Sequence, residues 1–298
     1  MFTHEIIRNA WLAGTFIALA CGAIGWFVVV RAQVFAGDAL SHVAFGGAIA
    51  AAAVGIDERI GLFTLTLALA STMGLLGRRA QADDLAIGVV LAWVLGIGVF
   101  LLAILATSAQ GGSGIITANA LFGSIFSLTA SEAVVAAAVA LAVVLALLMA
   151  VRPLLLSTLD AELAAARGIP VRLLGIAFLG ALAVVAAEST QAVGALLLVG
   201  LIAAPGGAAT SLTARPYLGI ALSATIAVAS MWGGLTLSYA IASLPASTAV
   251  VGLAAIAYAL AGTWSRWRRG RSRNGEARAA APAAVGTRPD AVSRRRDV

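Results

Sequence analysis

The chain contains a succession of uncharged apolar stretches, each about as long as a helix that crosses a lipid bilayer. Roughly 17–25 apolar residues in a helix span the hydrocarbon core of a bilayer. Lipid offers no hydrogen-bond partner to the backbone, and a helix satisfies its own backbone groups. The sequence therefore predicts an all-α, polytopic membrane protein. We count nine candidate spans, at residues 8–31, 35–55, 60–77, 84–107, 131–151, 171–188, 192–213, 216–243 and 246–265.

Composition agrees with this class and excludes an ordinary soluble domain. The chain is 61% hydrophobic and 11% charged, and its mean hydropathy is +1.03. Its 32 glycines and abundant alanines favour closely packed membrane helices. Glycine, proline and polar residues interrupt the stretches 35–55 and 192–213, so eight spans is the alternative count. The segment 118–126 is too short to span and is either a re-entrant half-helix or a packed outer loop.

The arginines give the stretches an order. No lysine occurs, and most arginines before the tail lie at alternate ends of the spans, whereas Arg8 and Arg59 lie at the opposite ends. The positive-inside rule then places the N-terminus outside and the C-terminus in the cytoplasm. We expect a transmembrane domain over 1–265. The basic tail 266–298 is predicted to be disordered, with membrane lipid as its contact and no nucleic acid.

Asp38 and His42 are the ionisable residues that most need an explanation. They are four residues apart inside an apolar stretch, so a helix places them on one face. Ionisable groups inside membrane segments are costly and mark transport pathways by default. A carboxylate oxygen with an imidazole nitrogen suits a divalent cation, and the same pair suits a proton relay. Ser41 is adjacent and is a candidate hydrogen-bond donor to the pair.

Five segments carry a resemblance to a known family. The run Gly37-Asp38-Ala39-Leu40-Ser41-His42 resembles the signature of the permease subunits of manganese/zinc ABC importers, the ABC-3 family. Four more segments are similar to motifs of that family and occur in its order, at 83–88, 121–124, 160–170 and 193–205. Two departures are the glycines after Pro205 and the missing proline after His42. The resemblance covers roughly residues 10–265.

The resemblance implies an ABC importer permease bundle in a bacterial cell (inner) membrane, for zinc or manganese, with ferrous iron as a further candidate. It implies that Asp38 and His42 hold the metal in transit. Glu188 is a weaker candidate ligand, and an interfacial carboxylate in water is the equal alternative. The resemblance also makes the cytoplasmic helix at 158–170 the contact with the ATPase, through four residues: Asp160, Glu162, Arg167 and Gly168.

The expected partners follow from the same resemblance. They are a separate ABC ATPase subunit, an extracytoplasmic metal-binding protein and a second copy of the chain as a homodimer. The sequence has no G-x-x-x-x-G-K-[ST] phosphate loop, so we expect a transport subunit that is not itself an enzyme and holds no permanent cofactor.

Three alternatives stay open. A proton- or cation-coupled secondary transporter would use the pair as a relay. An ABC permease for a metal chelate would need a wider path. A membrane scaffold would not need the pair.

Overall fold

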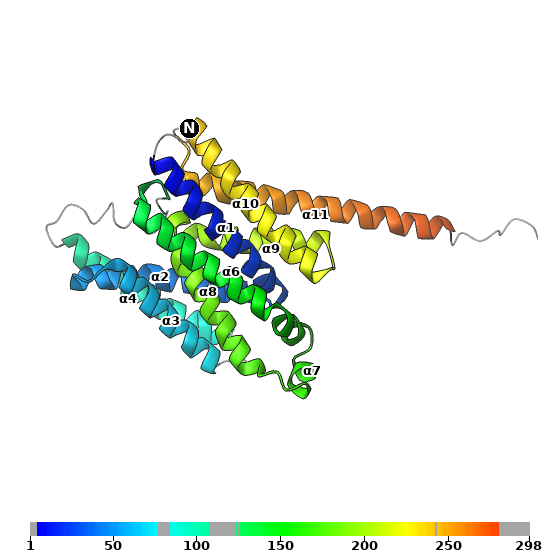
Figure 1. Cartoon of the computed structure of the whole chain (residues 1–298), viewed down its shortest axis with the longest axis horizontal. Coiled ribbons are helices and arrows are strands. Elements are labelled where there is room, and N and C mark those ends of the chain that lie inside the picture. Colours follow the sequence, from blue (N-terminus) through cyan, green and yellow to red (C-terminus); the bar gives the residue numbers. More distant parts are fainter. Residues whose placement is uncertain (1–4, 77–83, 108–122, 124, 242, 280–298) are drawn as a thin grey trace, which may run out of the picture.

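The computed structural model describes residues 5–76, 84–107, 123, 125–241 and 243–279 (Figure 1). These residues form helices and connecting turns, and no strand occurs among them. The elements are α1 (Glu5–Val30), α2 (Val34–Val54), α3 (Glu58–Leu76), α4 (Asp84–Thr107), the 3-10 turn η2 (Ile125–Ser127), α6 (Ala130–Leu159), α7 (Ala161–Ala166), α8 (Val171–Val193), α9 (Ala195–Leu212), α10 (Pro216–Ala240) and α11 (Ala246–Ala279).

The long helices coincide with the apolar stretches of the sequence. Within the described ranges, nine helices have 18 residues or more, one in each predicted span. Six of these are long and apolar enough to cross a membrane, namely α1, α2, α6, α8, α10 and α11. The prediction of an all-α, multi-span membrane protein is therefore confirmed.

Helix α1 forms the centre of the bundle and packs against α6, α8, α9 and α10. Glycines allow the closest of these approaches. A methyl group added at Gly22 would lie 2.6 Å from the Cα atom of Ala224, and one added at Gly206 would lie 2.5 Å from the carbonyl oxygen of Gly25. Small residues thus bring α9 and α10 into backbone contact with α1, as expected for membrane helices.

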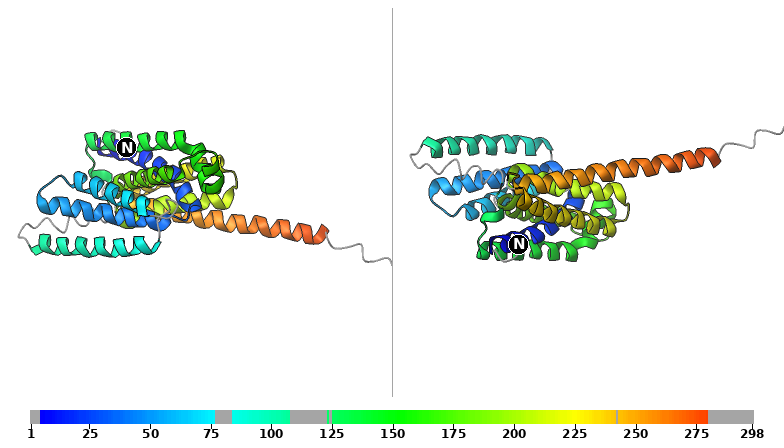
Figure 2. Two further views of the ribbon diagram at one scale, coloured as in Figure 1. Left: turned by 90° about the horizontal axis from the view of Figure 1, so that it is seen from below. Right: turned by 90° about the horizontal axis from the view of Figure 1, so that it is seen from above.

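Helices α2, α3 and α4 form a layer beside this centre. Helix α2 packs against α3 and α4 on one side and against α8 and α9 on the other. Figure 2 shows α4 as the outermost helix of this layer, on the far side of α2 and α3 from α1 and α6. Helix α8 joins the two groups, because it packs against both α3 and α6.

Three details differ from or complete the sequence-based picture. Helix α9 continues through Pro205 without a break. Helix α11 stays helical to Ala279, beyond the start of the tail that we expected to be disordered, and projects from the bundle (Figure 1). Residues 280–298, and most of the segment 118–126, lie outside the described residues.

Candidate metal pathway

Asp38 and His42 lie on successive turns of α2, close to its first residue, Val34. The Nε2 atom of His42 is 3.7 Å from Oδ1 of Asp38. The His42 side chain is 16% exposed and that of Asp38 is 36% exposed, so the pair opens to the surface of the chain through the carboxylate. The structure therefore brings together the two residues that the sequence selected.

The pair leaves room for further ligands. The Nδ1 atom of His42 is buried and has no hydrogen-bond partner among the residues that the structure describes. No group of three or more His, Cys, Asp or Glu side chains gathers around it or elsewhere in the described residues. Two donors of different hardness, one oxygen and one nitrogen, can contact a divalent cation but do not enclose it. Such a cation would keep water or take ligands from a neighbouring chain.

Ser41 connects α2 to the joint between α8 and α9. Its Oγ atom lies 2.7 Å from the carbonyl oxygen of Asp38 and 3.2 Å from that of Ala195. The hydroxyl group therefore bonds to main-chain carbonyls, whereas the sequence suggested a bond to the side chains of the pair. Gly194 forms the whole joint and has φ 92° and ψ 154°. Only glycine reaches this backbone region without strain.

The joint lies beside the middle of α2. Ala195 is buried in contact with Phe45 and Ile49, on the two turns of α2 that follow His42.

A cleft of about 1040 Å³ lies between the α2–α3 loop and the last turn of α8. Its walls come from the α2–α3 loop, the first turns of α3 and α6, and the last turn of α8. Phe45 and Ala48 of α2 also line it, and Phe45 is three residues after His42. The cleft therefore approaches the pair along α2 from the end of the bundle that carries Arg59.

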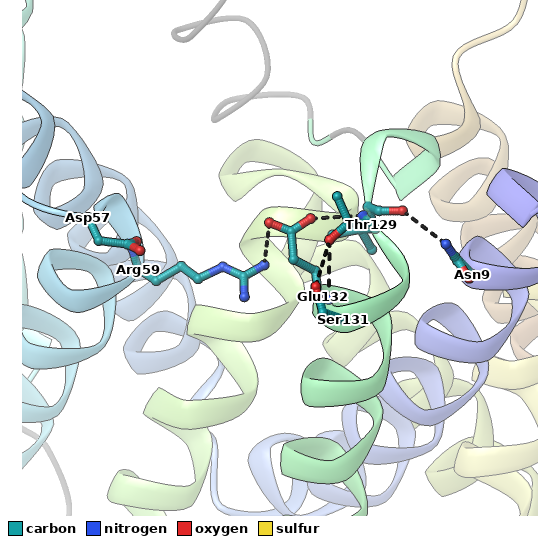
Figure 3. A network of polar contacts seen from close by, with 7 residues as sticks. Asn9, Asp57, Arg59, Thr129, Ser131 and Glu132 are labelled. Atoms are coloured by element: carbon teal, nitrogen blue, oxygen red, sulfur yellow. Dashed lines mark hydrogen bonds and ion pairs between the residues drawn. The ribbon is translucent and has the colours of Figure 1, made fainter.

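An ion pair crosses this cleft. Nη2 of Arg59, on the first turn of α3, is 3.0 Å from Oε1 of Glu132, on the first turn of α6. Figure 3 shows Arg59 extended from α3 toward the carboxylate of Glu132. The other oxygen of Glu132 accepts a hydrogen bond from the backbone N–H of Thr129, and the Thr129 hydroxyl accepts one from the Glu132 N–H. This capping box fixes the carboxylate in place.

Glu188 does not join the pair. It is 5% exposed, so the alternative of a solvated interfacial carboxylate is wrong. Its neighbours include Ile17 of α1 and Val139 of α6. The residue before it, Ala187, faces Ala44 of α2 instead. Glu188 thus lies on the side of α8 that faces away from Asp38 and His42.

The predicted coupling residues form a short helix at the opposite end of the bundle (Figure 1). Asp160 caps α7, because its Oδ1 accepts a hydrogen bond from the Leu163 N–H at 2.9 Å. Arg167 ends the helix, and Gly168 follows with φ 77°. Glu162 and Arg167 have exposed side chains. Asp160 and Gly168 therefore have a structural role in shaping α7, whereas the other two present charge at its surface.

Arg31 is a residue whose contacts the sequence did not reveal. It lies between α1 and α2, and its guanidinium group donates hydrogen bonds to Thr158 and Ser157, both at 2.9 Å. The same group lies 4.8 Å from the ring centre of Phe178. Burial lowers the pKa of Arg31 to about 10, so it stays charged at neutral pH. Arg31 thus ties the start of α2 to the end of α6, directly before α7.

Comparison with protein families identifies the family to which the chain belongs. The model of the ABC 3 transport family matches residues 3–264. The chain belongs to the ABC 3 transport family. This family member is 28% identical to the manganese transport system membrane protein MntC of Halalkalibacterium halodurans, over 91% of this chain and 94% of the relative. It is 27% identical to the manganese import system permease protein ScaB of Streptococcus parasanguinis, over 83% and 88%.

Solved structures show the same fold. This ABC 3 family chain superposes on PsaBC from Streptococcus pneumoniae in complex with Fab with a TM-score of 0.75 and 24% identity, over 87% of this chain and 91% of that one. A putative metal-chelate type ABC transporter in an inward-facing conformation gives a TM-score of 0.58 at 18% identity, over 86% and 85%. The family suggested by the five sequence segments is thereby confirmed, whereas the roles of Asp38, His42 and α7 stay predictions.

Proposed function

We propose that the chain is the membrane permease of an ATP-driven importer for a divalent metal ion, with manganese as the first candidate and zinc or ferrous iron as alternatives. The observation that carries this proposal is the Asp38–His42 pair, which is open to further ligands on α2 of an ABC 3 family bundle. Two relatives are named as manganese transport proteins, and a third, from Haemophilus influenzae, is named a probable iron transport system membrane protein.

The pair supplies the chemistry of a transient site. A metal that arrives through the Arg59-side cleft meets Phe45 and then His42 along α2. Asp38 offers a hard oxygen and neutral His42 offers a nitrogen, a combination that Mn²⁺, Fe²⁺ and Zn²⁺ accept. A closed site with four protein ligands would hold the ion, whereas two ligands allow its release. The exposed Asp38 carboxylate gives a second copy of the chain a position from which to add ligands, and we therefore propose a homodimer.

The opposite end of the bundle is the proposed contact with a separate ATPase subunit. Helix α7 presents Glu162 and Arg167, and the hydrogen bonds of Arg31 connect the segment before α7 to the start of α2. A displacement of α7 would thus reach the helix that carries the metal ligands. The arginine-rich α7 end faces the cytoplasm in this proposal, and an extracytoplasmic metal-binding protein delivers the ion to the cleft.

The test is uptake of radioactive Mn²⁺ by cells that contain this permease with its ATPase and binding protein. We expect Asp38→Ala and His42→Ala each to lower uptake at least tenfold at unchanged amounts of protein in the membrane. Glu5→Ala, which removes an exposed carboxylate far from the pair, is the matched control and should leave uptake unchanged. Full uptake by both variants would show that the metal does not pass this pair.

A second measurement separates the proposal from proton-coupled transport. Vesicles that contain the permease and its ATPase are loaded with ATP on the ATPase side, and a protonophore is added. Uptake that persists supports the ATP-driven importer. Uptake that collapses with the proton gradient and does not need ATP would assign the pair to a proton relay instead.

A further inference from the structure

The α7 end of helices α9, α10 and α11 carries positive charge without any acidic partner. No Asp or Glu occurs in the sequence between Glu188 and Glu276. Arg215, Arg266 and Arg268 are exposed, and among the described residues none of the three forms an ion pair. Three guanidinium groups therefore face outward with their charge uncompensated.

An apolar groove of about 640 Å³ lies beside these arginines. It is formed by the end of α9 and by one face of α11, and its lining residues are Leu212, Ala257, Leu260, Ala261, Thr263, Trp264 and Trp267. Arg215 comes three residues after Leu212. Arg268 comes four residues after Trp264, so it continues the groove face of α11 by one turn.

Two tryptophans mark the boundary between the apolar and the charged part. The rings of Trp264 and Trp267 lie 5.4 Å apart at 41°. Both side chains are about half exposed. Tryptophan is enriched at the headgroup level of membranes, where one edge of the ring is apolar and the other is hydrated. Along this face of α11 the side chains thus pass from aliphatic to aromatic to cationic within three turns.

We propose that this end of α9 and α11 is a binding site for an anionic phospholipid. One acyl chain lies in the groove against Leu260 and Trp264, and the phosphate of the headgroup meets Arg215, Arg266 and Arg268. A guanidinium group can donate two parallel hydrogen bonds to the oxygens of one phosphate, which makes this contact strong and directional. A zwitterionic lipid carries a positive group beside its phosphate. Its headgroup has no net charge and therefore does not neutralise the charge of the three arginines.

The charge also argues against a second copy of this chain as the occupant. A symmetric contact through this groove would bring six arginines together, and residues 189–275 of either copy would contribute no carboxylate. Such like-charge contact is unfavourable at the edge of a membrane, where screening is incomplete. An anionic lipid instead supplies both the apolar chain and the missing negative charge.

The experiment measures quenching of tryptophan fluorescence in the full-length protein, reconstituted in phosphatidylcholine vesicles. Either brominated phosphatidylglycerol or brominated phosphatidylcholine is added as quencher. The quenching in the parent protein minus the quenching in Trp264→Phe/Trp267→Phe gives the contribution of these two tryptophans. We expect phosphatidylglycerol to bind at this position at least tenfold more tightly than phosphatidylcholine. Each arginine near an anionic headgroup contributes about fivefold.

The arginine variants decide between a site and a general attraction. Arg215→Gln/Arg266→Gln/Arg268→Gln should bind both lipids within about twofold of each other. Arg152→Gln, which removes an exposed arginine of α6 at the same end, is the matched control and should keep the preference. Equal binding of the two lipids by the parent, or an unchanged preference in the triple variant, overturns the proposal. So does a tryptophan pair that neither lipid quenches, because protein then covers the groove.

Discussion

The Oγ atom of Ser41 lies 3.2 Å from the carbonyl oxygen of Ala195, and both residues are fully buried. This contact joins α2, the helix that carries Asp38 and His42, to the one-residue joint between α8 and α9. Asp38 and His42 flank Ser41 in the sequence, so a shift of the joint relative to α2 would also move the pair. Movements of the α8–α9 joint and of the Asp38–His42 pair are therefore coupled.

Replacement of Gly194 by another residue should strain the joint between α8 and α9. Its backbone conformation costs other residues about 1–3 kcal/mol, so Gly194→Ala should lower the apparent Tm of the purified protein by several degrees. Gly180→Ala, inside the preceding helix α8, is the control, because a methyl group there meets no atom of the described residues within 4 Å. It should leave the Tm unchanged. Equal Tm values for the two variants would mean that the joint relaxes without cost.

The ion pair between Arg59 and Glu132 should hold the two walls of the cleft together. Glu132→Gln keeps an oxygen for the capping box and removes the charge that binds Arg59. A partly exposed ion pair of this kind contributes about 0.2–1 kcal/mol, so thiol labelling of Ala52→Cys in the cleft should become up to about fivefold faster. Arg59→Gln should have the same effect.

The double variant provides the check on that pair. If the two side chains act through one another, Arg59→Gln/Glu132→Gln should label no faster than either single variant. Rates that multiply in the double variant would show that the two residues act separately. Native Cys21 is buried, and its replacement by Ala in all of these proteins removes background labelling.

Arg31 should need its guanidinium shape as well as its charge. Arg31→Lys keeps the charge but loses the planar guanidinium group. A lysine ammonium group cannot donate to Thr158 and Ser157 and also lie flat against Phe178. Hydrogen bonds to a charged group contribute about 1.5–3 kcal/mol when largely buried, and we expect a loss of roughly half that here. Thermal unfolding of Arg31→Lys should reveal it. Arg152→Lys, on an exposed position of α6, should unfold like the parent protein.

The sequence predicted the features that depend on neighbours along the chain. The nine long helices follow from the length of the apolar stretches, because a helix of that length spans a bilayer. Asp38 lies beside His42 because residues four apart share one face of a helix. Glu188 could not be placed in this way. Its burial depends on which side of α8 meets α1 and α6, and the turn before it, residues 184–187, is apolar on every side.

Contacts between distant segments were equally hidden. The sequence did not connect Arg59 with Glu132, because the two residues are 73 positions apart in the chain, although their charged groups lie 3.0 Å apart. The same holds for Gly194, whose motif was visible but whose position beside the middle of α2 required the packing of three helices.

The glycines after Pro205, which depart from the family pattern, should be needed for the contact of α9 with α1. A methyl group at Gly206 would lie 2.5 Å from the carbonyl oxygen of Gly25, so α9 must move away to accept it. Overpacking of this kind costs about 1–3 kcal/mol. Gly206→Ala should therefore lower the apparent Tm, whereas Gly252→Ala in α11, with no atom within 4 Å, should not. Gly206→Ala with parental stability would show that the two helices can separate freely at this point.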